Sequence, residues 1–377
     1  MNQRERFHAV FSYQPVDRIP IWDFGFWDQT LAEWRKQGVP KDVHPDDFFG
    51  MDRQWCYAAT KVGLLPHFEK KVIEDRGGFE IVQMSDGVIA RQPKDFTSMP
   101  DFIDHMLKDR RSWEEHYKWR LNPETAGRLP PEYFAQLKEW RGRDYPIIIH
   151  CGSVFGDLRS WLGLENFSYI QYDDPRLFRE MTETIAHCTA VTLERILGEA
   201  ARAGITFDMA HFWEDICYNH GPLINPRTFC EVGVPLYQRI TGVCRKHGIK
   251  WFSVDCDGKV DELILPWREG GVQTMFPVEV GDWADPLELR RRFGRELLMM
   301  GGIDKRTLAR GPQAIDAMIE HLTPLVEEGG YLPTPDHRVP PDVSLENYIY
   351  YLQRIKHLWG HDLPDVRPTG SPGPGDV

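Results

Sequence analysis

The sequence predicts an α/β protein built as a single distorted (β/α)8 barrel with N-terminal excursions. From residue 145 onward, short apolar segments alternate with helical segments, which is the pattern of parallel βα units. Five of these apolar segments end in residues that can ionise or bind a cation. In a (β/α)8 barrel such strand ends meet on one face, where the active site lies. The pattern therefore indicates an enzyme.

The N-terminal part is predicted to be less regular. A short helix over 4–11 and a turn near Pro15 precede a buried strand over 18–27, which ends in aromatic residues. Residues 28–145 are mixed and charged, and we interpret them as helices and irregular excursions. The regular alternation is thus expected to begin at about residue 145.

The regular part is marked by apolar runs and by helix boundaries. Asp or Asn before Pro is a favoured helix start, and Gly is a favoured helix stop. Strands are predicted at 145–151, 205–209, 249–254, 272–276, 297–300 and 330–335, and helices at 174–204, 225–248, 285–294, 311–330 and 343–358. A folded domain is expected over 1–362, followed by a disordered tail over 363–377 that is rich in Pro and Gly.

Composition excludes several classes of protein. Hydrophobic residues make up 41% of the chain and charged residues 27%, so a sizeable core is expected. The net charge of -12 argues against a nucleic-acid partner. The seven cysteines include no CxxC pair, which argues against a disulfide framework and a zinc ribbon. No signal peptide or membrane-length apolar run is present, so we expect a cytoplasmic protein.

Two carboxylates follow one predicted strand. Asp255 and Asp257 lie two residues apart, so in extended backbone both side chains would point the same way. Carboxylates that close require a proton or a cation between them, which favours a metal site or a general acid or base. Alternatively, one of them caps the following helix.

Histidines and acids mark two further strand ends. His337 lies beside Arg338 after the last predicted strand, where an imidazole would ligate a metal, move a proton or bond to the barrel rim, and where Arg338 would contact substrate. His211 and Glu214, three residues apart, would reach a common cation. The alternative for Glu214 is that it complements the dipole of a helix start.

Aromatic side chains cluster near the predicted strand ends. Most are expected in the core, and some are expected to line a pocket for a flat or apolar substrate. The candidates for the pocket are Trp22, Phe24, Trp27, Phe155 and Phe212.

Several segments resemble the uroporphyrinogen decarboxylase superfamily across roughly residues 2–358. The resemblance is carried by the opening from Asn2 to Val10, Pro15-Val-Asp-Arg-Ile-Pro20, Gly301-Gly-Ile-Asp304 and the stretch from Gly329 to Tyr348. It implies a distorted (β/α)8 barrel with its cleft at the carboxyl ends of the strands, and a homodimer. Decarboxylases of this superfamily bind porphyrinogen carboxylates through two N-terminal arginines, whereas residues 21–27 contain none.

The departure favours the second branch of the superfamily, the corrinoid-dependent methyltransferases. Thiol-specific members bind zinc through a His-x-Cys-Gly pair and a later Cys. This chain has Asp255-Cys-Asp-Gly258 at the first place, and His337 falls near the second. The resemblance thus implies zinc held by Asp255, Asp257, His337 and His211. The zinc would polarise the leaving group of a small O- or N-methylated substrate, and the methyl group would pass to a corrinoid protein.

Three interpretations follow, of which zinc-dependent methyl transfer is the first. In it, His337, Glu214, His211 and Asp257 take part in catalysis. The second is a metal-independent decarboxylase or other lyase acting on a non-porphyrin carboxylate, in which an acid stabilises a cationic intermediate and His337 moves the proton. The third is a non-catalytic binding protein on a barrel scaffold, since fold alone does not establish catalysis.

Overall fold

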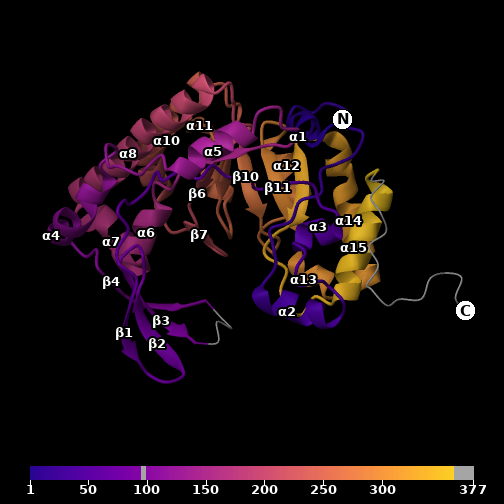
Figure 1. Cartoon of the computed structure of the whole chain (residues 1–377), viewed down its shortest axis with the longest axis horizontal. Helices are drawn as coiled ribbons and strands as arrows, with labels where there is room; N and C mark the ends of the chain where they lie inside the picture. The colour runs from indigo at the N-terminus through magenta and orange to yellow at the C-terminus, as the bar shows by residue number, and fades with distance from the viewer. Residues whose placement is uncertain (95–98, 361–377) are drawn as a thin grey trace, which may run out of the picture. The chain divides into compact units, whose positions relative to one another are not determined.

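The computed structural model of the chain describes residues 1–94 and 99–360 (Figure 1). By its internal contacts the chain divides into two compact units. The first unit comprises Met1–Cys56, Asp144–Ile147 and the chain from Thr274 onward; the second comprises Tyr57–Arg143 and Ile148–Gln273. The predicted tail at 363–377 lies outside the described residues. Both units contain parallel strands followed by helices, which confirms the predicted α/β class.

In the second unit, β5 (Ile148–His150), β6 (Met209–Trp213) and β9 (Trp251–Asp255) run parallel and side by side. Paired positions on neighbouring strands point to the same face of a sheet. His150 is paired with His211, and His211 with Ser253. The register therefore places these three polar side chains next to one another.

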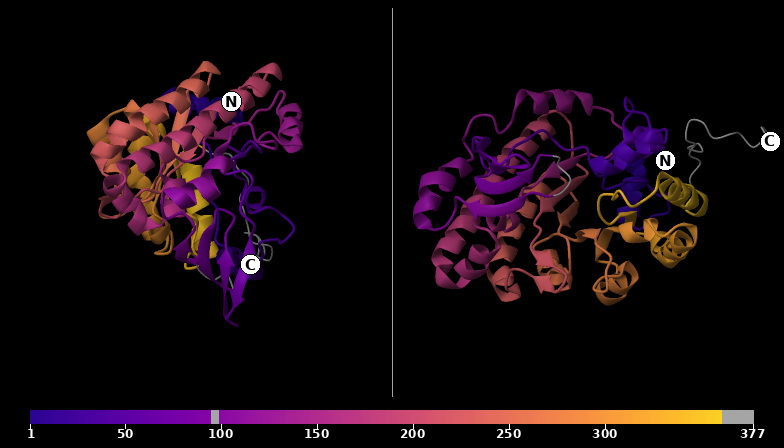
Figure 2. Two further views of the ribbon diagram at one scale, coloured as in Figure 1. Left: turned by 90° about the vertical axis from the view of Figure 1, so that its left-hand side faces the viewer. Right: turned by 90° about the horizontal axis from the view of Figure 1, so that it is seen from below.

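Long helices follow these strands and pack against each other. Helix α8 (Pro175–Arg202) begins as predicted, because the Asp174 carboxylate accepts the N–H of Leu177 at 2.9 Å. The predicted helix over 225–248 is also confirmed. It consists of α9 (Pro226–Thr228), a π-helical turn η3 (Phe229–Gly233) and α10 (Val234–Lys246). Helices α8 and α10 lie side by side (Figures 1 and 2).

An antiparallel sheet at one end of the second unit corrects the sequence analysis. Strands β1 (Lys71–Asp75), β2 (Phe79–Gln83), β3 (Val88–Pro93) and β4 (Asp101–His105) pair in chain order. The prediction of helices and irregular excursions was wrong for this stretch. Every residue of β1 is exposed, so the alternation of apolar and polar residues that marks a half-buried strand is missing there. The turn Asp86-Gly87 before β3 was the available signal.

The other described elements of the second unit are mostly short. They are α4 (Arg110–Ser112), the π-helical turn η1 (Trp113–Tyr117), the 3-10 turn η2 (Lys118–Leu121), α5 (Pro131–Glu139), α6 (Gly156–Leu162), α7 (Leu164–Asp173), β7 (Cys217–Tyr218), β8 (Gly221–Pro222) and α11 (Asp261–Glu269). Within the described residues, no helix is both long and apolar enough to span a membrane.

The first unit contains a second set of parallel strands. These are β10 (Thr274–Val278), β11 (Leu298–Ile303) and β12 (Tyr331–Pro335), all close to their predicted places. Its described helices are α1 (Gln3–Phe11), α2 (Asp28–Lys36), α3 (Pro45–Phe49), α12 (Pro286–Phe293), α13 (Lys305–Leu308), α14 (Pro312–Glu328) and α15 (Leu345–Leu358). The helices predicted at 4–11, 285–294, 311–330 and 343–358 are therefore confirmed.

The strand predicted over 18–27 is wrong. The segment is irregular, apart from an isolated bridge between Phe26 and Val339. Side chains bind its backbone where a neighbouring strand would. The Asp52 carboxylate accepts the N–H of Ile21 at 2.8 Å, and the Gln54 amide oxygen accepts that of Asp23 at 2.5 Å. A buried backbone can form its hydrogen bonds with a neighbouring strand or with side chains, and hydrophobicity alone does not distinguish the two cases.

Candidate active site

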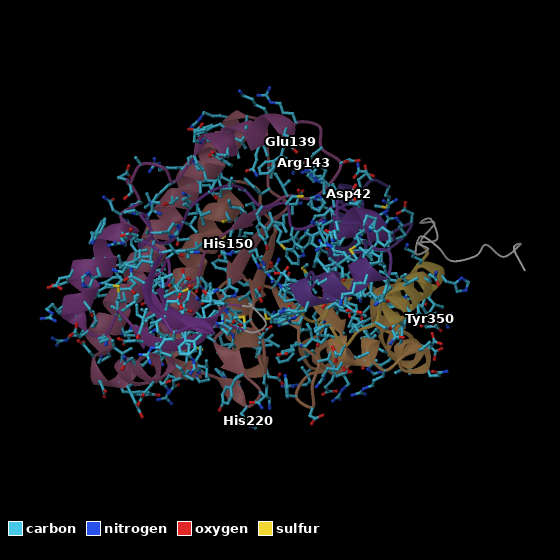
Figure 3. All side chains as sticks on the ribbon, turned by 60° about the horizontal axis from the view of Figure 1, so that its bottom comes forward. Asp42, Glu139, Arg143, His150, His220 and Tyr350 are labelled. Atoms are coloured by element: carbon cyan, nitrogen blue, oxygen red, sulfur yellow. The ribbon has the colours of Figure 1, made fainter. Side chains whose placement is uncertain are left out.

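Polar side chains gather at the carboxyl ends of β5, β6 and β9 in the second unit. His150 ends β5, His211 lies inside β6, and Asp255 ends β9. His211 was predicted to follow a strand at 205–209, but β6 begins at Met209 and includes it. Figure 3 labels His150 among the strands, whereas the exposed His220 lies at the periphery of the unit.

The two histidines form an uncharged pair, in which His211 is buried and His150 is half-buried. Their ring centroids are 5.9 Å apart. Burial lowers the pKa of His150 to about 4. Burial, together with repulsion from His150, lowers the pKa of His211 well below its ordinary value. Both imidazoles are therefore neutral at physiological pH. His150 Nδ1 accepts the N–H of Gly152 at 2.9 Å, and His211 Nδ1 lies 2.7 Å from Ser253 Oγ.

The carboxyl group of Asp255 has a raised pKa, in contrast to the lowered pKa values of the two histidines. Burial, followed by repulsion from Asp257 and Asp215, raises the pKa of Asp255 well above its ordinary value. Asp255 thus keeps a proton at a pH where an exposed aspartate has lost it. Repulsion from Asp257 agrees with the prediction that the two side chains lie close together. Tyr57 adds a neutral phenol, since burial and the charge of Asp255 raise its pKa, and its ring centroid is 5.9 Å from that of His211.

Glu214, which was predicted to be a catalytic acid, lies in the protein interior. Its side chain is fully buried, and burial raises its pKa. Oε2 accepts the N–H groups of Phe155 and Gly156, and Oε1 accepts the N–H of Val154 at 2.8 Å and the hydroxyl of Tyr237 at 2.5 Å. Both oxygens are already bonded inside the protein, and the carboxylate holds the turn that begins α6.

Phe155 and Phe212 lie in an aromatic core. Both side chains are fully buried. The Phe155 ring packs against Phe178 and Phe229 at centroid distances of 6.0 and 5.4 Å, and Phe212 contacts Tyr237 at 5.2 Å. Since Phe212 neighbours His211 on β6, its side chain points to the opposite face of the sheet. These contacts place both rings in the packing behind the strands.

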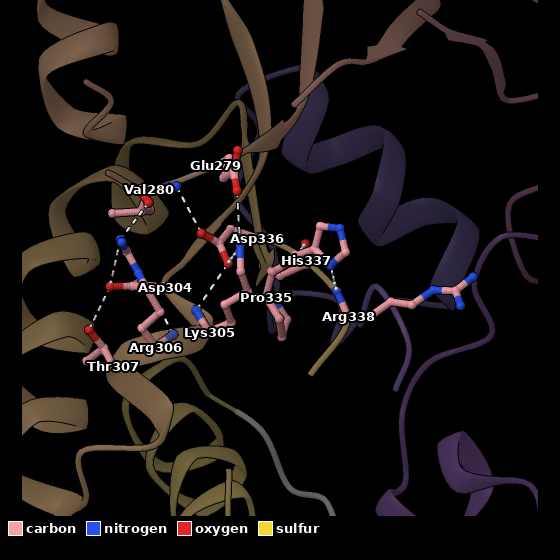
Figure 4. Close-up of polar contacts among 11 residues, drawn as sticks. Glu279, Val280, Asp304, Lys305, Arg306, Thr307, Pro335, Asp336, His337 and Arg338 are labelled. Atoms are coloured by element: carbon pink, nitrogen blue, oxygen red, sulfur yellow. Dashed lines mark hydrogen bonds and ion pairs between the residues drawn. The ribbon is translucent and has the colours of Figure 1, made fainter. Parts of the chain in front are cut away.

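The remaining predicted residues belong to the first unit. The His337 ring lies 5.4 Å from the half-buried Phe24, and its Nδ1 accepts the N–H of Arg338 at 2.8 Å (Figure 4). The Arg338 side chain is exposed. Trp22 is buried and stacks on Phe7, so it belongs to the core. Trp27 is half-buried and stands at the start of α2. Phe24, His337 and Arg338 are thus brought together within this unit.

The acid before His337 organises the turns around it (Figure 4). Asp336 is fully buried and accepts the N–H of Val280 at 2.9 Å and that of Lys305 at 3.1 Å. The Lys305 ammonium lies 3.7 Å from Asp336 and 3.1 Å from Glu279. Burial raises the pKa of Asp336 to about 6 in spite of this cation. The network positions the backbone from which His337 projects.

The described residues do not fit the expected zinc ion. Among them, no group of three or more His, Cys, Asp and Glu side chains could hold a metal. Zinc sites in proteins use at least three protein ligands.

Some residues of the candidate site were missed in the sequence. His150 ends a predicted strand, so the rule applied to the other strand ends would have included it. Asp215 follows Glu214 directly, and only the structure distinguishes the half-buried Asp215 from the fully buried Glu214. Tyr57 lies in the irregular N-terminal part, and no pattern in the sequence marks it.

Parallel βα units with ionisable groups at the strand ends are the architecture of a barrel enzyme. Residues 109–358 match the model of the uroporphyrinogen decarboxylase (URO-D) family, and the chain belongs to this family. The family fold is a (β/α)8 barrel, in agreement with the predicted fold class. No curated protein sequence matches the chain.

The comparison with solved structures finds the following similarities. A methyltransferase from Methanosarcina mazei is 13% identical, with 95% of this chain and 99% of that chain covered and a TM-score of 0.60. A B12-independent methionine synthase from Shewanella sp. W3-18-1 is 13% identical, with 76% and 72% covered and a TM-score of 0.37. A protein from Listeria monocytogenes described as a vitamin-B12 independent methionine synthase is 13% identical, with 90% and 96% covered and a TM-score of 0.39. At this identity the first likeness shows the fold alone, and the other two carry no argument.

Proposed function

We propose that this chain is a methyltransferase that removes a methyl group from a small O- or N-methylated compound, with Asp255 as the acid that protonates the leaving group. The observation that carries the proposal is the position of Asp255. It is a half-buried carboxyl group at the end of β9, one strand away from His211, and its charge acts on the neutral phenol of Tyr57, whose ring packs against neutral His211. Membership of the URO-D family and the fold of the Methanosarcina mazei methyltransferase support it.

The chemistry of demethylation requires such an acid. When the bond between the methyl carbon and oxygen or nitrogen breaks, the electron pair stays on the heteroatom. An alkoxide or amide anion is a poor leaving group, so a proton must arrive as the bond breaks. Asp255 supplies this proton, because burial and its carboxylate neighbours keep it protonated. The products are the free alcohol or amine and a methylated acceptor.

The methyl acceptor we expect is a corrinoid carried by a separate protein, which enters as the second substrate. After each turnover Asp255 would take up a proton that comes from water, and the neutral imidazoles of His150 and His211 would at most relay it. The substrate contacts assigned to Phe24, Arg338 and Trp27, the catalytic role of His337 and the homodimer stay predictions.

The test is a demethylation assay with free cob(I)alamin as the acceptor probe. A panel of methoxylated and N-methylated compounds is screened, and methylcob(III)alamin is followed by its absorbance. Asp255→Asn should lower the rate about 100-fold or more, the usual contribution of a positioned acid. Asp173→Asn, at an exposed position in the same unit, is the matched control and should retain full activity. Equal rates for wild type and Asp255→Asn, with both folded by circular dichroism, would remove Asp255 from the mechanism.

A carboxy-lyase is the second candidate. It is favoured by the same protonated acid, which can protonate the carbanion left when CO2 departs, and by the lack of a three-ligand metal group in the described residues. The distinguishing experiment offers a panel of small carboxylates without any acceptor. Release of CO2 that is lost in Asp255→Asn would favour the lyase, whereas methylation of cob(I)alamin without CO2 favours methyl transfer.

A further inference from the structure

A cavity of about 520 Å³ opens in the second unit, and Trp213 at the end of β6 is part of its lining. This is within the range of roughly 300–1,000 Å³ that is typical of small-molecule sites. One wall comes from β3, β4 and the turn before β3, and the other from α6 and the end of β6. The contact between the walls is fixed by His105 Nδ1, which lies 3.0 Å from the backbone oxygen of Ser160. Figure 1 shows α6 and α7 next to this antiparallel sheet.

Arg159 is the cation of this cavity, and it is poorly satisfied. Its guanidinium lies 3.6 Å from Asp215, which is an ion pair longer than a hydrogen bond. Its buried Nε has no hydrogen-bond partner among the described residues. The side chain is 22% exposed and stands 5.8 Å from the centroid of Trp213. A half-buried guanidinium with so few partners is costly unless a ligand binds it.

Part of the cavity lining is apolar. Phe102 and Leu164 are 51% and 54% exposed, although both are large hydrophobic residues. Together with Val88 and Trp213 they line the same cavity. Exposed apolar surface that is gathered in a concave site indicates a ligand with an apolar body.

The acids that line the cavity already have partners. Asp101 forms an ion pair with Arg91 at 2.7 Å, and Asp86 accepts the N–H of Val88 at 3.1 Å. Among the charged side chains that line the cavity, Arg159 therefore has the most hydrogen-bond donors left for a ligand. A guanidinium presents a planar fork of donors that matches a carboxylate.

We propose that this cavity binds a small carboxylic acid with a flat apolar body. Its carboxylate pairs with Arg159, and its body packs against Trp213, Val88 and Phe102. That this ligand is the substrate rests on the proposed function, because Trp213 is paired in register with Asp255. Binding itself does not depend on that function. The substrate class would then be a methylated aromatic or similarly flat carboxylate.

The test measures binding to the full chain by ¹⁹F NMR, without any methyl acceptor. The probes are 4-fluorobenzoate, its neutral analogue 4-fluorobenzamide and the cation 4-fluorobenzylamine. We expect 4-fluorobenzoate to bind more tightly than the other two. Arg159→Met should lower the affinity for 4-fluorobenzoate at least about tenfold, as expected for loss of a charged hydrogen-bonded pair. The affinity for 4-fluorobenzamide should not change.

Matched variants separate the charge from the apolar wall. Arg159→Lys keeps the charge without the fork and should give an intermediate affinity. Phe102→Ser changes an exposed position, so the variant should fold. It should lower the affinity for both 4-fluorobenzoate and 4-fluorobenzamide. Arg179→Met removes a 55% exposed arginine of the same unit and should change neither. Equal affinity of Arg159→Met and wild type for 4-fluorobenzoate, or preference for 4-fluorobenzylamine, would overturn the proposal. Because no turnover is measured, these results are independent of the Asp255 assay.

Discussion

At the scale of single residues, the buried carboxyl group of Asp23 links stability to pH. It is 1% exposed and bonded to the Tyr348 hydroxyl, and burial raises its pKa to about 7. The folded chain therefore holds this proton up to about pH 7, whereas the unfolded chain releases it near the ordinary value of 3.8. The stabilisation is fully present below that ordinary value and is lost as the pH rises towards 7. We expect the loss to be roughly 2–4 kcal/mol.

The measurement is urea denaturation at several pH values between 4 and 8. Asp23→Asn cannot titrate, so its free energy of unfolding should fall less than that of wild type as the pH rises. Asp42→Asn, at an exposed position of the same unit (Figure 3), is the control and should follow wild type. Parallel curves for wild type and Asp23→Asn would contradict the raised pKa.

Glu214 gives a second prediction at this scale. Glu214→Ala leaves the buried donors around residues 153–156 without an acceptor, so it should lower the free energy of unfolding by more than about 3 kcal/mol. Glu214→Gln retains one acceptor oxygen and should cost less. Glu231→Ala, at an exposed position, should stay within about 0.5 kcal/mol of wild type in the same denaturation experiment. A Glu214→Ala variant as stable as wild type would show that these bonds are replaceable.

Sequence reasoning placed both Glu214 and Asp255 near strand ends, with Glu214 in catalysis and Asp255 as a zinc ligand. Their difference lies in the backbone, because the turn over 153–156 aims its N–H groups at Glu214. Asp255 has carboxylate neighbours instead. No property of the two residue types predicts which acid meets which surroundings.

At the scale of elements, the start of α6 depends on the small size of Gly156. A methyl group at this position would overlap the backbone carbonyl of Glu214, which is a rigid neighbour. Gly156→Ala should therefore lower the free energy of unfolding by about 3 kcal/mol or more. Gly242→Ala in the exposed middle of α10 meets nothing within 4 Å, and it should raise stability by about 0.5–1 kcal/mol. Both predictions are checked by thermal denaturation. A Gly156→Ala variant with the melting temperature of wild type would be inconsistent with this packing.

Helix boundaries were predicted well because their causes are local. Asp174, Asn225 and Asp285 each accept a backbone N–H of the helix that they precede, as their residue types indicate. The antiparallel sheet was missed although its strands pair in chain order, because its outer strand is exposed on both faces and lacks the alternation of a half-buried strand. The segment 18–27 was apolar enough for a strand, but side chains from 52–54 bind its backbone instead.

At the scale of the whole molecule, we predict that the stability and the activity of the protein do not depend on zinc. The purified chain should keep its melting temperature and its demethylation rate after dialysis against a strong zinc chelator, because no described group of side chains can hold the ion. Metal content measured before and after dialysis gives the occupancy. Loss of activity that zinc alone restores would bring back the predicted ligands Asp255, Asp257, His211 and His337.

The fold class could be predicted from the whole sequence, because the alternation of strands and helices repeats many times and errors in one element matter little. The site could be predicted only in part. Strand ends identified Asp255 and His211, which lie on the neighbouring strands β9 and β6. Nearness to predicted strand ends also proposed Phe155 and Phe212, which are fully buried in the aromatic core, because position along the chain does not say toward which side a ring packs.

The exposed edge of the antiparallel sheet has a consequence for solubility. Strand β1 pairs with β2 on one side, and all of its residues are exposed, including Val72 and Ile73 at 53% and 52%. Such an edge is a template on which a strand of another molecule can add. Lys71 and Asp75 bracket the apolar pair, and charges of this kind oppose stacking of identical chains. The sheet that forms one wall of the proposed binding cavity is thus also the place where loss of a single charge would most readily start aggregation.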